Sequence, residues 1–170
     1  AAGWAADMDL SSLDGSNGFR LDGVYSGNLS RKLPVSSAGD VNGDGYGDVI
    51  IGSYHADPDG KYDAGESYVV FGKAAGFTAG LDLSALDGAD GFRLDGVDAS
   101  ENSGRSVSDA GDVNGDGFGD LIIGAPGAAT YTGESYVVFG KASGFTGDLA
   151  LADLDGSDGF RIDGVGTYDY

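Results

Sequence analysis

The apolar residues of this chain gather in short runs that recur along the sequence. Asp48–Gly52 and Asp120–Gly124 each hold three consecutive branched apolar residues, the pattern of a strand that is buried on both faces. Ser67–Phe71 and Ser135–Phe139 combine aromatic with β-branched residues, which favour sheet structure. All four runs are shorter than a typical helix, so we expect each of them to form a strand.

A second pattern alternates apolar with charged residues and occurs three times. It begins at Phe19, at Phe92 and at Phe160, and reads Phe-Arg-Leu-Asp or Phe-Arg-Ile-Asp. Alternation places the charged side chains on one face of a strand, so we expect a half-exposed edge strand at each position. Weaker strands are expected at Leu33–Ser37 and Ser106–Ala110, and nothing beyond a single turn near Ser84 looks helical.

These patterns belong to a sequence repeat that covers almost the whole chain. For example, GESYVVFGKAAGFT at Gly65–Thr78 returns as GESYVVFGKASGFT at Gly133–Thr146. Four short strands in each repeat describe one blade of a β-propeller. The predicted fold is therefore all-β, with two four-stranded blades and an extra N-terminal edge strand.

The units of the repeat are unequal in number, because three alternating strands accompany only two copies of the unit that contains the run at Asp48–Gly52 or Asp120–Gly124. We therefore expect residues 1–30 to hold the outer strand of a preceding blade, residues 31–98 the first blade and residues 99–170 the second. Two blades leave large apolar faces without neighbours. We expect the chain to be part of a longer propeller, or to assemble as a homo-oligomer or a filament.

A nine-residue motif, Asp-Val-Asn-Gly-Asp-Gly-aromatic-Gly-Asp, occurs at Asp40–Asp48 and again at Asp112–Asp120. Each copy places oxygen-bearing side chains at positions 1, 3, 5 and 9 of one tight loop. Carboxylates so close together repel one another unless a cation lies among them, and Ca²⁺ takes hard oxygen ligands. The motif therefore predicts two calcium sites; the alternative is a glycine-aspartate hairpin turn without metal.

The flanking residues separate the families that use such loops. An EF-hand needs a Glu at position 12 and helices on both sides, whereas Ile51 and Ile123 stand there, inside predicted strands. A strand, an aspartate loop and an apolar strand ending in Gly124-Ala125-Pro126 resemble the FG-GAP repeat of integrin α-chain β-propellers. The resemblance implies structural ions, each held by four side chains and one backbone carbonyl. The implied ligands are Asp40, Asn42, Asp44, the Tyr46 carbonyl and Asp48, then Asp112, Asn114, Asp116, the Phe118 carbonyl and Asp120.

Composition narrows the range of functions. The chain has 28 acidic against 9 basic residues and a net charge of −19, which argues against nucleic-acid binding. It contains no Cys, so thiolate metal sites and disulfides are excluded. No apolar run approaches the roughly 20 residues of a membrane span. Since no nucleophile–base arrangement or phosphate loop is present either, we expect a protein that is not an enzyme.

The hypothesis that follows is a secreted, calcium-binding structural or adhesion module that acts through protein–protein contacts or self-assembly. The start Ala1-Ala2-Gly3 fits a mature end left after signal cleavage. A carbohydrate-binding, lectin-like propeller is the alternative, because some proteins that resemble this family are lectins. Of the remaining polar residues, His55 and the 57–63 loop are interpreted as surface features. We expect Glu66 and Glu134 to pair with an arginine such as Arg93 or Arg161.

Overall fold

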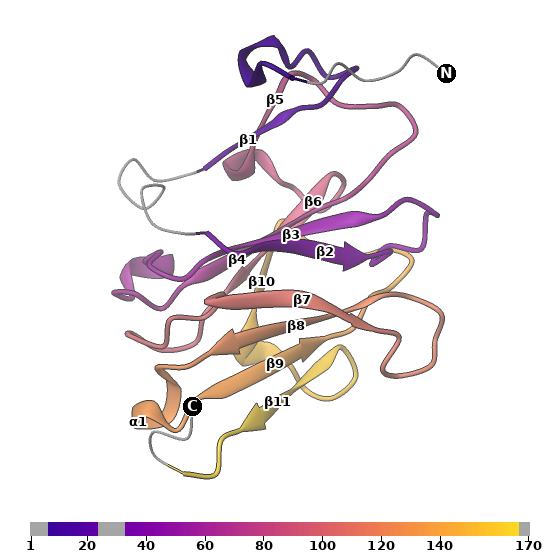
Figure 1. The fold of residues 1–170 in the computed structure, drawn as a ribbon. Helices are drawn as coiled ribbons and strands as arrows, with labels where there is room; N and C mark the ends of the chain where they lie inside the picture. Colours follow the sequence, from indigo (N-terminus) through magenta and orange to yellow (C-terminus); the bar gives the residue numbers. More distant parts are fainter. Residues whose placement is uncertain (1–6, 24–32, 167–170) are drawn as a thin grey trace.

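The repeats fold into sheets that lie one above the other along the chain (Figure 1). The structure is a computed structural model and describes residues 7–23 and 33–166. Parts of the expected N-terminal segment, Trp4 among them, lie outside the described residues. Within the described ranges, no helix is long and apolar enough to cross a membrane.

Each repeat forms a four-stranded antiparallel blade, in which the apolar runs form strands as predicted and take the two central positions. The strands of the first blade are β2 (Val35–Gly39), β3 (Asp48–Ser53), β4 (Glu66–Val70) and β6 (Gly91–Asp95). Those of the second blade are β7 (Ser106–Gly111), β8 (Asp120–Ala125), β9 (Glu134–Val138) and β11 (Gly159–Asp163). The all-β fold of propeller blades is therefore confirmed.

Within the described ranges, three further strands of three residues each take part in the contacts between repeats. They are β1 (Arg20–Asp22), β5 (Gly80–Asp82) and β10 (Asp148–Ala150). β5 pairs in parallel with β1, and β10 pairs in parallel with β6, in the same register. Thus the short strand of each repeat joins the outer strand of the repeat before it. The sequence pattern predicted β1 but neither β5 nor β10.

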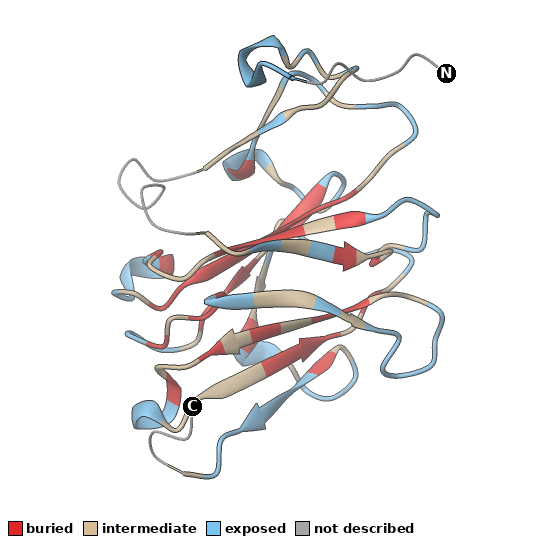
Figure 2. Cartoon of the chain, viewed as in Figure 1, coloured by how far each residue is buried: buried red, intermediate tan, exposed pale blue. Residues whose placement is uncertain are grey.

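The prediction of an edge strand is wrong for β6. Phe92 and Leu94 are fully buried in it, because β10 extends the sheet beyond β6 and the second blade covers its face. The corresponding strand of the second blade, β11, is an edge strand as predicted, but its apolar residues are exposed together with its charged ones (Figure 2).

Single helical turns complete the described fold. They are η1 (Leu10–Ser12), η3 (Pro58–Gly60), η4 (Leu83–Ala85), η5 (Leu151–Asp153) and α1 (Ala128–Tyr131). η1 and η4 begin after an aspartate, Asp9 or Asp82, whose side chain accepts a hydrogen bond from a backbone N–H of the turn at 2.9 Å. The turn expected near Ser84 is therefore present.

Two apolar clusters hold these layers together. The larger lies between the blades and includes Ile50, Phe92, Leu121 and Tyr136. The smaller lies on the opposite face of the first blade, where Ile51 and other core residues pack against side chains of β1 and β5. The first blade is therefore covered on both faces, which is why β4 and β6 are the most deeply buried strands of the described chain (Figure 2).

Candidate metal-binding loops

The two aspartate loops connect the first and second strands of their blades, with the same local structure. Gly43 and Gly45 have φ of +71° and +86°, and Gly115 and Gly117 repeat these values closely at +79° and +92°. Such left-handed backbone is strained for residues with a Cβ atom, so the glycines of the motif are what allow the turn. The shape of both loops therefore follows from the motif itself.

In the first loop, the side chains at positions 1, 3 and 5 accept hydrogen bonds from the backbone of the turn. Asp40 accepts the N–H groups of Asp44 and Gly45, both at 3.0 Å. Asn42 also accepts from the N–H of Asp44 at 3.0 Å, and Asp44 accepts from Tyr46 at 2.8 Å. The three side chains thus turn toward the backbone that lies between them.

The second loop repeats this arrangement bond for bond and adds one contact. Asp112 accepts the N–H groups of Gly115, Asp116 and Gly117 at 2.7, 3.0 and 2.9 Å. Asn114 accepts from Asp116 at 2.9 Å, and Asp116 accepts from Phe118 at 2.9 Å. Two independent copies of the motif therefore form the same set of inward-facing oxygen atoms.

The ninth position of the motif behaves differently, because Asp48 and Asp120 are buried. The Asp48 carboxylate accepts the N–H groups of Val41 and Gly72, both at 2.8 Å. Burial raises the pKa of Asp48; these two hydrogen bonds oppose that effect, and the charges of Asp44 and Asp40 add to it. Asp120 makes the equivalent bonds at 2.7 and 2.9 Å. This aspartate fastens each loop to the end of a neighbouring strand.

The arrangement bears on the predicted calcium ligands. Among the described residues, no three acidic or histidine side chains are grouped so that they could hold a metal ion. In each loop, the first, third and fifth positions share the same turn. The ninth position instead begins the strand that follows the loop, β3 or β8. The donor set nevertheless fits Ca²⁺ chemically, because every implied side-chain ligand offers oxygen and none offers sulfur or imidazole. The ten implied ligands therefore stay a prediction.

The first loop also forms part of the joint between the blades. The carbonyl of Asp40 accepts the N–H of Gly119 at 2.9 Å, and the carbonyl of Val41 accepts the N–H of Lys141 at 2.9 Å. A Cβ atom added to Gly43 would lie 2.3 Å from a carbon of the Phe118 ring. Sequence analysis missed this role, because the motif gives no sign of what packs against it.

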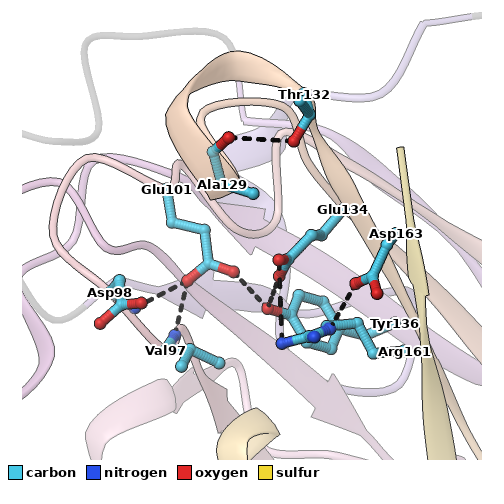
Figure 3. Close-up of polar contacts among 9 residues, drawn as sticks. All are labelled: Val97, Asp98, Glu101, Ala129, Thr132, Glu134, Tyr136, Arg161 and Asp163. Atoms are coloured by element: carbon cyan, nitrogen blue, oxygen red, sulfur yellow. Dashed lines mark hydrogen bonds and ion pairs between the residues drawn. The ribbon is translucent and has the colours of Figure 1, made fainter. Parts of the chain in front are cut away.

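A second polar group, centred on the buried Tyr136, lies beside the joint (Figure 3). Its hydroxyl contacts the carboxylates of Glu101 and, at 2.6 Å, of Glu134. Glu101 is buried and also accepts the N–H groups of Val97 and Asp98 at 2.7 and 2.8 Å. Burial, together with both carboxylates, raises the pKa of Tyr136, so the phenol stays protonated and braces the 97–101 turn against β9.

The arginine pairings differ between the two repeats. Arg161 lies 3.8 Å from Glu134, as expected, but bonds more closely to Asp163 at 2.6 Å. Arg93 instead binds Asp95 at 2.6 Å, and the buried Glu66 receives its hydrogen bond from the Tyr68 hydroxyl. The repeat therefore predicts which residues take part in polar contacts, but it does not predict which residue each of them binds.

Side-chain contacts hold the 57–63 loop in place, which the interpretation as a surface feature did not include. Asp57 accepts the backbone N–H of Asp63 at 2.7 Å, and His55 Nδ1 lies 2.8 Å from the Asp63 carboxylate. The histidine is half-buried. We therefore interpret these residues as a brace for the loop.

Comparison with known proteins agrees with this architecture. The family model described as FG-GAP repeat matches residues 35–70 and 104–138. The first match runs from β2 to β4 and contains the 40–48 loop. The second begins just before β7, ends with β9 and contains the 112–120 loop.

Curated relatives include an enzyme and integrins. Phosphatidylinositol-glycan-specific phospholipase D of Bos taurus is 36% identical over 112 residues, which cover 64% of this chain and 13% of the phospholipase. Integrin alpha-PS5 of Drosophila melanogaster is 33% identical over 107 residues, 63% of this chain and 10% of the integrin. Integrin alpha pat-2 of Caenorhabditis elegans is 32% identical over 131 residues, 69% of this chain and 10% of that protein.

The chain thus spans only about an eighth or a tenth of the length of these relatives. The repeats matched by the family model, and the blades that they form, identify the chain as a member of the FG-GAP repeat family of integrin α-like β-propellers.

Proposed function

We propose that this chain is a calcium-stabilised module that acts through protein–protein contacts. The observation that carries the proposal is the double role of the 40–48 loop, which gathers inward-facing oxygen atoms and also bonds to the second blade through Asp40 and Val41. Bound calcium would supply positive charge among the carboxylates. A loop ordered in this way would hold the two blades in a fixed relation.

The residues that would hold the ions are those named in the sequence analysis, with Asp40, Asn42 and Asp44 in the first loop and their counterparts in the second. Their role is to bind and orient, with no catalytic step. We propose that the chain is not itself an enzyme, because the polar groups described here are engaged in braces and turns. The phospholipase relative is matched over only 13% of its length.

We also propose that the module is secreted. Extracellular calcium-binding modules operate with dissociation constants of about 10⁻⁴–10⁻³ M. Carboxylates that already accept backbone N–H groups are suited to such weak, reversible binding, since they must share or exchange those partners when an ion binds.

Calorimetric titration of the full chain with CaCl₂ tests this function. We expect two ions per chain, one per chain in Asp44→Ala or Asp116→Ala, and none in the double variant. With the ion at tenfold Kd, each site should add about 1.4 kcal/mol to the free energy of unfolding. Asp87→Ala is the control, because that exposed aspartate also caps a turn but lies outside the motif. An absence of binding heat, with no change of Tm on adding EDTA, would contradict the proposal.

A glycan ligand remains the second candidate, for one reason. A groove at the end of the second blade combines charged and aromatic side chains, among them Arg105, Tyr131 and Glu134. Polar groups beside an aromatic ring are the usual composition of a small-ligand site. Binding on a glycan array that is lost in Tyr131→Ala would favour this function.

A further inference from the structure

Equivalent residues of the two blades differ sharply in exposure on one face. In the first blade, Val41, Phe92 and Leu94 are all 0% exposed. Their counterparts in the second blade, Val113, Phe160 and Ile162, are 50%, 37% and 48% exposed. The first two pairs are identical in residue type and the third exchanges Leu for Ile, so the difference in exposure comes from the neighbour, because the second blade covers this face of the first. We call the exposed set, Val113, Phe160 and Ile162, the open face.

The joint between the blades shows what covers such a face in this chain. Phe145 stacks on Phe92 with ring centroids 4.6 Å apart and planes inclined by 12°. β10 pairs in parallel with β6, placing Leu149 beside Leu94. The N–H of Arg93 donates to the carbonyl of Gly147 at 2.8 Å. An aromatic ring, a short parallel strand and this backbone bond thus form the part of the joint that lies along β6.

The same joint occurs again at the other end of the described chain. Phe77, the counterpart of Phe145, stacks on Phe19 at 3.9 Å, also with planes inclined by 12°. β5 pairs in parallel with β1, placing Leu81 beside Leu21. The N–H of Arg20 donates to the carbonyl of Ala79 at 2.9 Å. β1 therefore occupies the place of the outer strand of a preceding blade, although the described chain gives that sheet no other strand than β5.

We propose that a second copy of the chain covers the open face by strand exchange. In this arrangement β11 of one copy replaces β1 beside β5 of the next, so that Phe160 stacks on Phe77 of the second copy and Ile162 lies beside its Leu81. The inference rests on the proposed function and names its partner. A second copy is the occupant because this chain itself carries both halves of the joint, and the internal joint demonstrates that they fit.

The energetics favour the exchange at sufficient protein concentration. The backbone bonds of β1 are replaced one for one by those of β11, which carries Arg-Ile-Asp where β1 carries Arg-Leu-Asp. Burial of the open face is then a net gain, at roughly 25 cal/mol per Å² of apolar surface. The net charge of −19 on each copy opposes association, so salt and calcium should promote it. Since the contact is head-to-tail, it produces a ring or a filament.

A disulfide that holds β1 on β5, and that can be reduced again, tests the exchange on the full chain. The chain has no Cys of its own that could interfere. Asp22 and Asp82 are register partners in β1 and β5, so the disulfide of Asp22→Cys/Asp82→Cys holds β1 in place. By sedimentation velocity in CaCl₂ and high salt, we expect wild type and the reduced variant to associate as concentration rises. The oxidised variant should associate at least about tenfold more weakly, a loss of about 1.4 kcal/mol.

A matched lock on the internal joint is the control. Asp95 and Ala150 are register partners in β6 and β10, so oxidised Asp95→Cys/Ala150→Cys should associate like wild type.

Cross-linking between chains tests the proposed register directly. Mixing Asp163→Cys chains with Asp82→Cys chains should give a disulfide between different chains. Phe160→Ser should weaken association, whereas Tyr62→Ser, at another exposed aromatic residue, should not.

Three outcomes overturn the exchange: wild type that stays at monomer mass at every concentration, association that survives the oxidised β1 lock, and failure of the mixed chains to cross-link. Failure of the proposed function is distinguishable, because the locked monomer retains both aspartate loops. If that monomer still binds calcium, the function holds without the exchange; if it binds none, the function itself is wrong.

Discussion

Aspartate serves two purposes within each nine-residue loop, and burial separates them. The aspartates at positions 1 and 5 accept N–H groups of their own turn, which short carboxylates do readily. Asp48 and Asp120 are buried, and two backbone N–H groups offset the free energy that each carboxylate loses on leaving water. The loop is thus shaped by hydrogen bonds to its own acids, and calcium would act on a turn that already exists.

Glu66 is a buried acid of another kind, because one of its carboxylate oxygens has no hydrogen-bond partner among the described residues. Burial raises its pKa above the ordinary value of 4.5, although hydrogen bonding by Tyr68 and the charge of Arg93 oppose this. The folded chain therefore binds this proton more tightly than the unfolded chain does. The contribution of Glu66 to stability is greatest at low pH and is lost as pH rises through the folded pKa.

We therefore predict that Glu66→Gln is more stable than wild type at pH 7, by about 1 kcal/mol, the usual scale for one buried polar group. Gln keeps one oxygen as acceptor for the Tyr68 hydroxyl, replaces the other oxygen by an NH2 group and removes the charge. Thermal unfolding of both proteins in EDTA between pH 4 and pH 7 measures the difference. The advantage of the variant should shrink toward pH 4; an advantage that is equal at both pH values would rule out titration of Glu66 as its cause.

At the scale of elements, the sequence was sufficient to predict a strand wherever that strand has its own pattern of apolar residues. Runs such as Asp48–Gly52 have buried, branched side chains, and their strands follow from that alone. β5 and β10 have only three residues each, too few to show a period, and they are strands because an outer strand of another repeat lies beside them. The interior position of β6 escaped prediction for the same reason. For the loops, the motif predicted the turn and its glycines, but not the contact of Gly43 with Phe118.

That contact gives a prediction with an internal control. Gly43 and Gly115 have similar positive φ, so Ala at either position adds similar backbone strain, about 1 kcal/mol. Only at Gly43 does the added Cβ meet the Phe118 ring, while nothing lies within 4 Å at Gly115. Gly43→Ala should therefore lose about 1 kcal/mol more than Gly115→Ala, through overpacking of the joint.

Urea unfolding of both variants, at protein concentrations low enough to keep the chain monomeric, measures this difference. Equal losses would mean that the Phe118 ring moves aside at no cost and that the 40–48 loop does not constrain the joint. If copies associate through the open face, Gly115 gains a neighbour, and the two variants should become more alike as concentration rises.

At the scale of the whole molecule, position in the stack determines what each repeat becomes. Equivalent residues form a blade covered on both faces when a neighbour lies on each side, and a blade with one open face at the end of the described chain. Repeat architectures depend on such nearest-neighbour contacts. The sequence predicted the repeat, but which face of the described stack is open follows only from the exposure of Val113, Phe160 and Ile162.

The net charge of −19 is also a property of the whole molecule, since the acids of both loops and of the turns repel one another in the folded chain. Salt screens these charges, with a Debye length of about 10 Å at 0.1 M. In EDTA, the Tm should therefore rise by several degrees as NaCl increases from about 0.01 to 0.5 M, conditions that shorten the Debye length from about 30 Å to a few ångströms. In saturating CaCl₂ the rise should be smaller, because bound ions already neutralise the loop carboxylates. Equal salt dependence with and without calcium would mean that the loops take no part in the repulsion, and the case for ions within them would fail with it.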